Sequence, residues 1–476
     1  MRGTVTPSGS VARSGKRSGK EATTARILVP SGALGLGFDR MALQRGIAAK
    51  PDLIAIDGGS TDSGPSYLGR GESKYSRAST RTEWAQLVDA QARAGSPLVI
   101  GTAGTCGTDD AVEWMAEITE DVLREAGRAA RVAILKSGQN PEAMAAALGK
   151  GRLTALPAAP EIDAGVVRSC TNIVALAGAE QIAAALETGA EIVIAGRATD
   201  AAIIAALPLM RGCHAGTSWH GAKIGECGAL CTTHPQSGVI LIDFDDEGFT
   251  VAPLADDARA TPATVSAHML YENSDPRILL EPGGHLDVGG AGYEAVDGRS
   301  VRVSGAAWIP SDSYAVKLEG ARIAGYQTIL LALLRDKRYV EAAEFWAEDI
   351  HRLCSARAVE RLGLDADAFR IELRLIGKNA TLGTLEARTD EPAEVGVLAI
   401  ATAATQELAN EIGKILNPFL LHHPLTKQEE QPTFAFPFSP AEIDRGPAYE
   451  FCLNHILTID DPMEAFRLEV RELGHG

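Results

Sequence analysis

The feature that constrains the fold most is an alternation of short apolar runs and helix-forming segments between residues 27 and 200. Apolar runs occur at 27–29, 52–56, 98–100, 132–135 and 191–195, and polar or glycine-rich loops follow them. Segments such as 81–94 and 179–188 have the apolar spacing of helices. Short strands that alternate with helices of about 10–15 residues form a mostly parallel sheet. The sequence therefore predicts an α/β fold with helices on both faces of the sheet.

The pattern changes after about residue 235. Turn signals such as 245–248 and 297–298 alternate there with strand-like runs, and segments at 326–334 and 340–353 have helical patterns. A length of 476 residues allows two or three domains at about 150 residues each. We expect three parts, which are a disordered basic tail at 1–26, an α/β domain at 27–235 that carries the site, and a smaller α+β domain at 236–476.

Bulk composition excludes several classes of function. The formal net charge is −17, which is a poor match for a phosphate backbone, so we expect no nucleic-acid partner. The chain contains no run of about eighteen apolar residues, so we expect no membrane span. Seven cysteines in a long chain are typical of reduced thiols, which favours a cytoplasmic protein.

A loop of small residues follows the third apolar run, in the stretch PLVIGTAGTCGTDDAVEWM at 97–115. Thr108 or Asp109 can cap the helix expected after it. Such a loop can direct several backbone N–H groups at one spot, which suits an anion or an oxyanion. The residues predicted to bind substrate in this way are Gly104, Thr105, Gly107 and Thr108. The alternative is a tight turn that needs glycine for steric reasons and binds nothing.

Polar side chains also follow the other apolar runs, and ligands of open parallel sheets bind outside the carboxyl ends of the strands. Arg197, with Asp200 beside it, can bind a carboxylate. Lys136 can act as a general base if its pKa is lowered, together with Asp57 or Asp62. Each residue also has a structural alternative, because Asp57 can cap a turn and Arg197 can pair with Asp200.

Cys106 lies near the start of the helix expected after the 101–108 loop, where a thiolate is favoured. This position allows a Cys-dependent hydrolase or acyl transferase, and the alternative is a small packing residue. The further cysteines and histidines between 213 and 234, with Glu226, do not have the spacing of a standard zinc module, so we expect no metal. The loop PSGALGLG at 30–37 fits neither the dinucleotide fingerprint nor a Walker loop, which disfavours NAD and ATP and leaves the cofactor unknown.

Several long segments resemble the AtuA family, which is named for acyclic terpene utilisation. They are IDGGSTDSGPSYLG, GTAGTCGTDD, GAEIVIAGRATDAA, VSAHMLYENSDPRILLEPGG and FAFPFSPAEIDRGPAYEFCLNHIL, and the likeness runs from about residue 27 to 459. The resemblance implies that the protein acts together with enzymes that degrade citronellol and geraniol through CoA thioesters. It also implies a small partner protein. Family members often read GHLLECG where this chain reads AKIGECGALC, which keeps Glu226 and Cys227 and lacks the histidine.

These patterns favour a catabolic enzyme that acts on a small organic acid or its CoA thioester, with hydration or dehydration as the leading reaction. One alternative is the hydrolase or acyl transferase that uses Cys106. Another is a non-catalytic subunit that binds a small partner protein through apolar segments such as 433–438. We expect an anionic small-molecule substrate and a homo-oligomer.

Overall fold

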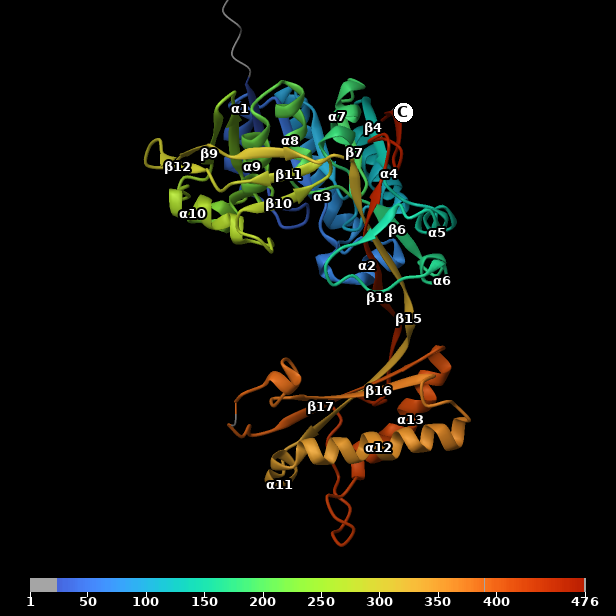
Figure 1. The fold of residues 1–476 in the computed structure, drawn as a ribbon. Coiled ribbons are helices and arrows are strands. Elements are labelled where there is room, and N and C mark those ends of the chain that lie inside the picture. The colour runs from blue at the N-terminus through green and yellow to red at the C-terminus, as the bar shows by residue number, and fades with distance from the viewer. Residues whose placement is uncertain (1–23, 389, 475–476) are drawn as a thin grey trace, which may run out of the picture.

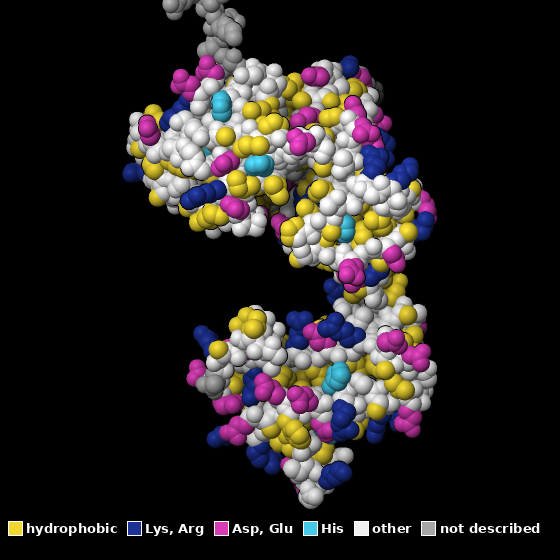
Figure 2. Space-filling view, in the orientation of Figure 1, with side chains coloured by type: hydrophobic (Ala, Val, Ile, Leu, Met, Phe, Trp, Pro, Cys, Tyr) yellow, Lys and Arg dark blue, Asp and Glu magenta, His cyan; other side chains and the backbone are white. Residues whose placement is uncertain are grey.

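The computed structural model describes residues 24–388 and 390–474, which form a larger and a smaller lobe. Two long strands run from one lobe to the other (Figure 1). In the space-filling view the lobes face each other across an open gap and join at one side (Figure 2). Most of the expected basic tail, residues 1–23, lies outside the described residues, and Ala25 and Arg26 already belong to the first strand.

A ten-stranded sheet organises the larger lobe, in the order β12-β13-β9-β8-β1-β2-β3-β7-β4-β19. Its centre is parallel, as the sequence predicts. The parallel strands are β1 (Ala25–Val29), β2 (Leu53–Asp57), β3 (Leu98–Gly101), β7 (Ile192–Ala195) and β4 (Ala130–Lys136).

Both faces of the parallel strands are buried, which explains why they read as uninterrupted apolar runs. One face packs against α1 (Arg40–Ala48), α3 (Arg77–Ala94) and α4 (Asp109–Glu125). The other face packs against α5 (Pro141–Gly149), α7 (Ala179–Glu187), α8 (Ala202–Met210) and α9 (Ala215–Gly225). The structure therefore confirms the α/β fold class with helices on both faces.

Antiparallel strands extend the sheet at both edges. The edge beside β1 carries β8 (Ile240–Phe244), β9 (Gly248–Pro253), β13 (Val301–Ser304) and β12 (Gly292–Ala295), and the edge beside β4 carries β19 (Arg467–Leu473). A three-stranded sheet of β10 (Ile278–Glu281), β11 (Gly284–Asp287) and β14 (Ala307–Pro310) belongs to the same lobe, with the short helices α2 (Pro65–Arg70), α6 (Ala164–Arg168) and α10 (Pro262–Ala267). The boundary expected between residues 235 and 236 thus falls inside the large lobe, because β8 pairs with β1 along its whole length.

The smaller lobe is built on a second, antiparallel sheet. It contains β16 (Phe369–Ile376), β17 (Val395–Ala403), β15 (Ala315–Leu334), β18 (Ile443–Thr458) and β5 (Leu153–Ala155), and β6 (Asn172–Ala175) also pairs with β15. Helices α11 (Lys337–Glu341), α12 (Ala343–Leu362) and α13 (Gln406–His422) pack on this sheet. Among the described residues, no helix is long and apolar enough to cross a membrane.

The long strand β15 corrects the helix expected at 326–334. That segment pairs residue by residue with β17, and the same strand pairs with β18 along most of its length. A continuous apolar run is compatible with both a buried strand and a buried helix, because it shows no hydrophobic period. Pairing with β17 and β18 makes this segment a strand. The other end of β15 pairs with β6 in the larger lobe, and there Glu319 contacts Arg197, which follows the parallel strand β7.

Candidate active site

A buried guanidinium lies at the carboxyl end of the parallel sheet. Arg197 follows β7, is only 7% exposed, and donates from Nε to Glu319 Oε2 at 3.1 Å. Further bonds run from its Nη1 to Thr102 Oγ1 at 3.2 Å and from its Nη2 to Thr61 Oγ1 at 3.4 Å. Loops from three parallel strands and one long strand of the second sheet therefore meet at this side chain.

Glu319 is the acidic partner of this guanidinium, and β15 positions it. Burial alone would raise the pKa of its carboxyl, but the charges of Arg197 and Lys317 outweigh burial and lower the pKa to about 2. Lys317 Nζ lies 2.9 Å from Glu319 Oε1, and Thr61 Oγ1 donates to Oε2 at 2.9 Å. Glu319 is thus a fixed carboxylate that holds Arg197 in place.

Asp57 ends β2 beside this pair and has the environment of a protonated acid. Burial raises its pKa well above the ordinary range, and the charge of Asp200 raises it further. Its Oδ2 accepts from the backbone N–H of Gly59 at 3.0 Å, in part the turn-capping role considered above. Its Oδ1 is buried and has no hydrogen-bond partner in the described part of the chain. Burial thus favours the protonated form of Asp57, and Oδ1 is the oxygen without a protein partner.

Asp200 is the accessible member of the group, with a side chain that is 31% exposed. Its Oδ1 lies 3.8 Å from Arg197 Nη1, so the expected pairing of these two residues is a loose contact, and Glu319 is the tighter partner. Burial raises the pKa of Asp200, Arg197 lowers it, and the charge of Asp62, an exposed residue, raises it. We refer to Asp57, Arg197, Asp200 and Glu319 as the strand-end cluster.

The 101–108 loop does not form the expected anion cradle. Its backbone N–H groups at residues 102, 103, 105, 106 and 107 all donate to backbone carbonyls. Gly107 is needed for close approach, since a Cβ there would lie 2.1 Å from Arg197 N. Gly104 has a positive φ of 64°, and Thr105 Oγ1 accepts from Lys74 N at 3.2 Å. Thr108 caps α4, as predicted. The loop is a tight turn that positions the Arg197 backbone.

Lys136 does not join the strand-end cluster. It ends β4 and forms ion pairs with Glu113 of α4 and with Glu469 of β19, the latter at 3.5 Å. The hydrogen bond with Glu113 raises the pKa of Lys136, whereas a general base needs a lowered one. The structure therefore gives no support to Lys136 as a general base, because an edge strand that the sequence did not reveal, β19, supplies part of its acidic surroundings.

Cys106 is a packing residue. It is fully buried among Leu68, Ala111, Val174 and Ala321, and burial raises the pKa of its thiol. A thiolate at the start of α4 is thus disfavoured, because desolvation outweighs the favourable helix terminus.

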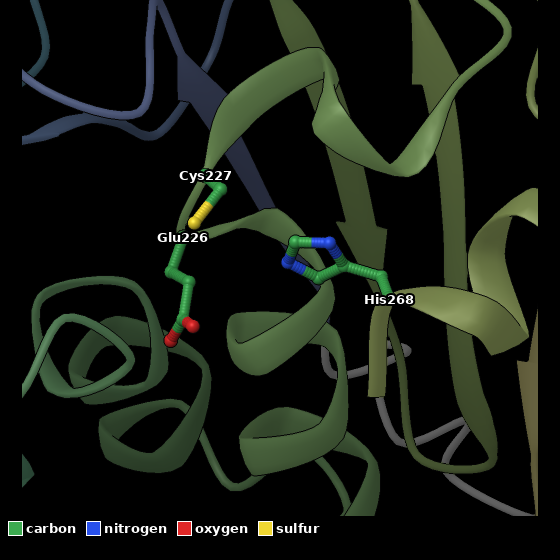
Figure 3. Close-up of side chains that lie close together, drawn as sticks. All are labelled: Glu226, Cys227 and His268. Carbon is green, nitrogen blue, oxygen red and sulfur yellow. The ribbon is translucent and has the colours of Figure 1, made fainter. Parts of the chain in front are cut away.

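A second group of ionisable side chains lies next to the strand-end cluster. Glu226 and Cys227 follow α9, and His268 approaches them from the short helix after α10 (Figure 3). Lys223 forms a buried ion pair with Glu226. The donor atoms of Glu226, Cys227 and His268 all lie within 4.8 Å of one another, and we call these three residues the donor triad. The charge of Asp200 raises the pKa of the Cys227 thiol, after burial and Glu226, which indicates that the two groups are neighbours.

A family model for the acyclic terpene utilisation protein AtuA matches residues 68–437, well over half of the chain. The chain belongs to the AtuA family. This AtuA-family match includes Arg197, Asp200 and Glu319, as well as the donor triad. It places the chain among proteins of acyclic terpene utilisation. No curated protein and no solved structure matches the chain.

Sequence reasoning missed Glu319, Glu281 and His268. Glu319 carries no local signal, because its partner Arg197 is 122 residues away. His268 and Glu281 both lie in the segment VSAHMLYENSDPRILLEPGG, which carried the resemblance to this AtuA family. A search of that segment for ionisable residues would have found them.

Glu281 provides a stability prediction for the AtuA-family site. Burial raises its pKa to about 8, although Thr199 Oγ1 donates to it at 2.6 Å. The unfolded chain ionises near 4.5, so the folded state binds more protons between pH 4.5 and 8, and stability falls as pH rises through this window. The free energy of unfolding of Glu281→Gln, measured relative to that of wild type, will therefore rise by roughly 1–3 kcal/mol between pH 5 and pH 8.

Urea unfolding at pH 5, 6.5 and 8 measures this gain. The matched control is Glu294→Gln on the exposed strand β12. A constant difference between Glu281→Gln and wild type across the three pH values would contradict the assignment.

Proposed function

We propose that this chain catalyses the hydration or dehydration of a small organic acid, or of its CoA thioester, in the degradation of acyclic terpenes. The observation that supports the proposal most is the pair of neighbouring carboxyls Asp57 and Asp200. Two carboxyls whose surroundings separate their pKa values are suited to act as acid and base in one reaction. Membership of a family named for acyclic terpene utilisation supports the choice of pathway.

The different burial of the two carboxyls assigns their roles. The pKa of Asp57 is raised more strongly, and the charge of Asp200 contributes to that rise, so Asp200 ionises first. Asp200 is then the carboxylate that takes a proton from the substrate carbon, and Asp57 is the acid that gives one. Asp200 is also the more exposed of the two, as a group that meets the substrate should be.

The dehydration step balances with these two groups alone. Asp200 accepts the proton next to the substrate carbonyl, and the electron pair of that C–H bond forms the new C=C bond. The C–O bond of the hydroxyl breaks, and the leaving oxygen takes the proton of Asp57 and departs as water. Asp57 is left ionised and Asp200 protonated, and a proton returned from Asp200 to Asp57 through solvent restores the enzyme. Arg197, positively charged and next to Asp200, stabilises the negative charge that develops on the substrate.

Two other functions receive less support. Burial raises the pKa of the Cys106 thiol, which disfavours the thiolate that the hydrolase would need. The partner-binding subunit was based on the apolar segment 433–438, in which Phe434 is buried against Tyr339 and Trp346 of its own lobe, whereas Phe438 is exposed. The proposals of a small partner subunit and of a homo-oligomer need size measurements on the purified protein.

The test is an assay of the purified protein with branched acyclic enoyl-CoA thioesters and the matching hydroxy acids, run in deuterated water. Hydration predicts loss of enoyl absorbance and one solvent deuterium at the carbon next to the carbonyl. Free thiol, measured in the same samples with a disulfide reagent, reports thioester hydrolysis. Thiol release without addition of water would contradict the hydratase and favour the hydrolase.

A further inference from the structure

We propose that the donor triad Glu226, Cys227 and His268 binds one divalent transition-metal ion, with Zn²⁺ as the best match. Carboxylate oxygen, thiolate sulfur and imidazole nitrogen are the three donor types that proteins offer to zinc. Softer metals prefer more sulfur, and Mg²⁺ or Ca²⁺ prefer oxygen alone. One donor of each type selects zinc or a close relative such as cobalt.

The geometry needs only small movements to close on an ion. Zinc bonds of about 2.0–2.3 Å in a tetrahedral site place neighbouring donors about 3.4–3.8 Å apart. The three donor atoms already lie within 4.8 Å of one another. Glu226 and Cys227 are adjacent in sequence, and His268 starts a separate helical turn, so two independent segments supply the ligands. Figure 3 shows the imidazole ring directed toward the other two residues.

An unpartnered nitrogen provides independent evidence for a ligand. His268 is only 4% exposed, and its Nε2 is buried with no hydrogen-bond partner in the described residues. A buried polar atom that lacks a partner costs about 1–3 kcal/mol, so folded proteins rarely leave one unused. One face of the ring stacks on Tyr271, with centroids 5.6 Å apart, which helps to fix the orientation of the imidazole. A metal ion would satisfy the free nitrogen.

The surrounding charge also favours a cation. Cys227 lies within the electrostatic reach of Glu226, Asp200 and Glu272, with Lys223 as the opposing positive charge. Lys223 donates to Oε1 of Glu226, and a carboxylate has a second oxygen that can bind a metal. A divalent cation bound here would favour the ionised forms of Glu226 and Cys227, which are the forms that bind metals.

Three protein ligands leave the fourth position of a tetrahedral zinc ion open, which is the pattern of catalytic sites. An ion there would lie near Asp200 and could bind the carbonyl or carboxylate oxygen of a substrate as a Lewis acid. This role depends on the proposed function, whereas metal binding itself does not. The ion would also help an acidic site to accept an anionic substrate.

The test measures metal binding without any substrate. Full-length protein is stripped with a chelator and then titrated with Zn²⁺ and with Co²⁺, and bound metal is counted by mass spectrometry. We expect one ion per chain and, for Co²⁺, a near-ultraviolet charge-transfer band that requires a thiolate ligand. Cys227→Ser will abolish this band, and His268→Ala will weaken binding at least tenfold.

Cys231→Ser is the matched control, because Cys231 is a fully buried thiol four residues away that donates to the Gly228 carbonyl. It will keep both the band and the affinity. Circular dichroism checks that each variant is folded. If a variant fails to fold, the metal affinity of the wild-type protein, measured by competition with a coloured chelator, still tests the proposal. Fewer than one ion per chain in wild type, or an unchanged cobalt band in Cys227→Ser, would overturn the proposal. Neither result depends on whether the protein hydrates a thioester.

Discussion

Arg197→Met will lower the free energy of unfolding by about 3 kcal/mol, the lower end of the range for breaking a buried ion pair. The methionine fills a similar volume but leaves Glu319 as a buried carboxylate that has lost its main partner. Lys317 remains beside Glu319 and keeps the loss from being larger. Urea unfolding followed by tryptophan fluorescence measures the change.

Two further variants separate the buried pair from a general effect of losing an arginine. Adding Glu319→Gln to Arg197→Met will restore part of the lost stability, because it removes the unpaired charge. Arg211→Met is the surface control, since Arg211 pairs with Asp52 at 2.9 Å with both side chains partly exposed. It will cost no more than about 1 kcal/mol. An equal loss for Arg197→Met and Arg211→Met would mean that the strand-end cluster does not depend on Arg197.

Asp200→Asn will lower kcat/KM about 10²–10⁴-fold, the usual contribution of a positioned acid or base. Asparagine keeps the shape of aspartate but cannot accept a proton as a base. The side chain is partly exposed and forms only a loose contact with Arg197, so we expect the fold to persist. Steady-state kinetics on the substrate found in the deuterium assay measures the loss.

Asp110→Asn is the matched control for this loss. Asp110 is an exposed aspartate in the first turn of α4, outside both clusters. It will change kcat/KM less than twofold. A decrease of less than about threefold in Asp200→Asn would remove Asp200 from proton transfer, and unfolding measured in parallel would identify a loss of structure.

The parallel sheet could be predicted because its strands are buried on both faces and its helices carry clear apolar periods. The 101–108 loop shows where such reasoning stops. Glycines and a helix start are visible in the sequence, but three of the carbonyls that accept from the loop's N–H groups belong to distant residues, Gly58, Ala195 and Gly196. A glycine-rich loop of this composition can form either an anion-binding site or a tight turn, and tertiary contacts determine which of the two it forms.

The strand-end residues divide for a similar reason. Asp57, Arg197 and Asp200 meet at the carboxyl edge, as the general rule for parallel sheets predicts. Lys136 also ends a parallel strand, β4. The antiparallel strand β19 pairs alongside β4 and places Glu469 next to Lys136. Glu319 belongs to β15, and the sequence pattern predicted a helix for a later part of that strand, 326–334. Contacts between residues more than one hundred positions apart, such as these, produce no local sequence pattern from which they can be predicted.

The central claim is that Asp57 and Asp200 act together on one substrate, and a double-mutant cycle on kcat/KM tests it most directly. Asp57→Asn imitates the protonated acid in shape, so both single variants and the double variant are expected to fold. If the two carboxyls share one proton-transfer sequence, the double variant will lose no more activity than about the worse single variant. Losses that multiply, as for two independent sites, would contradict the account.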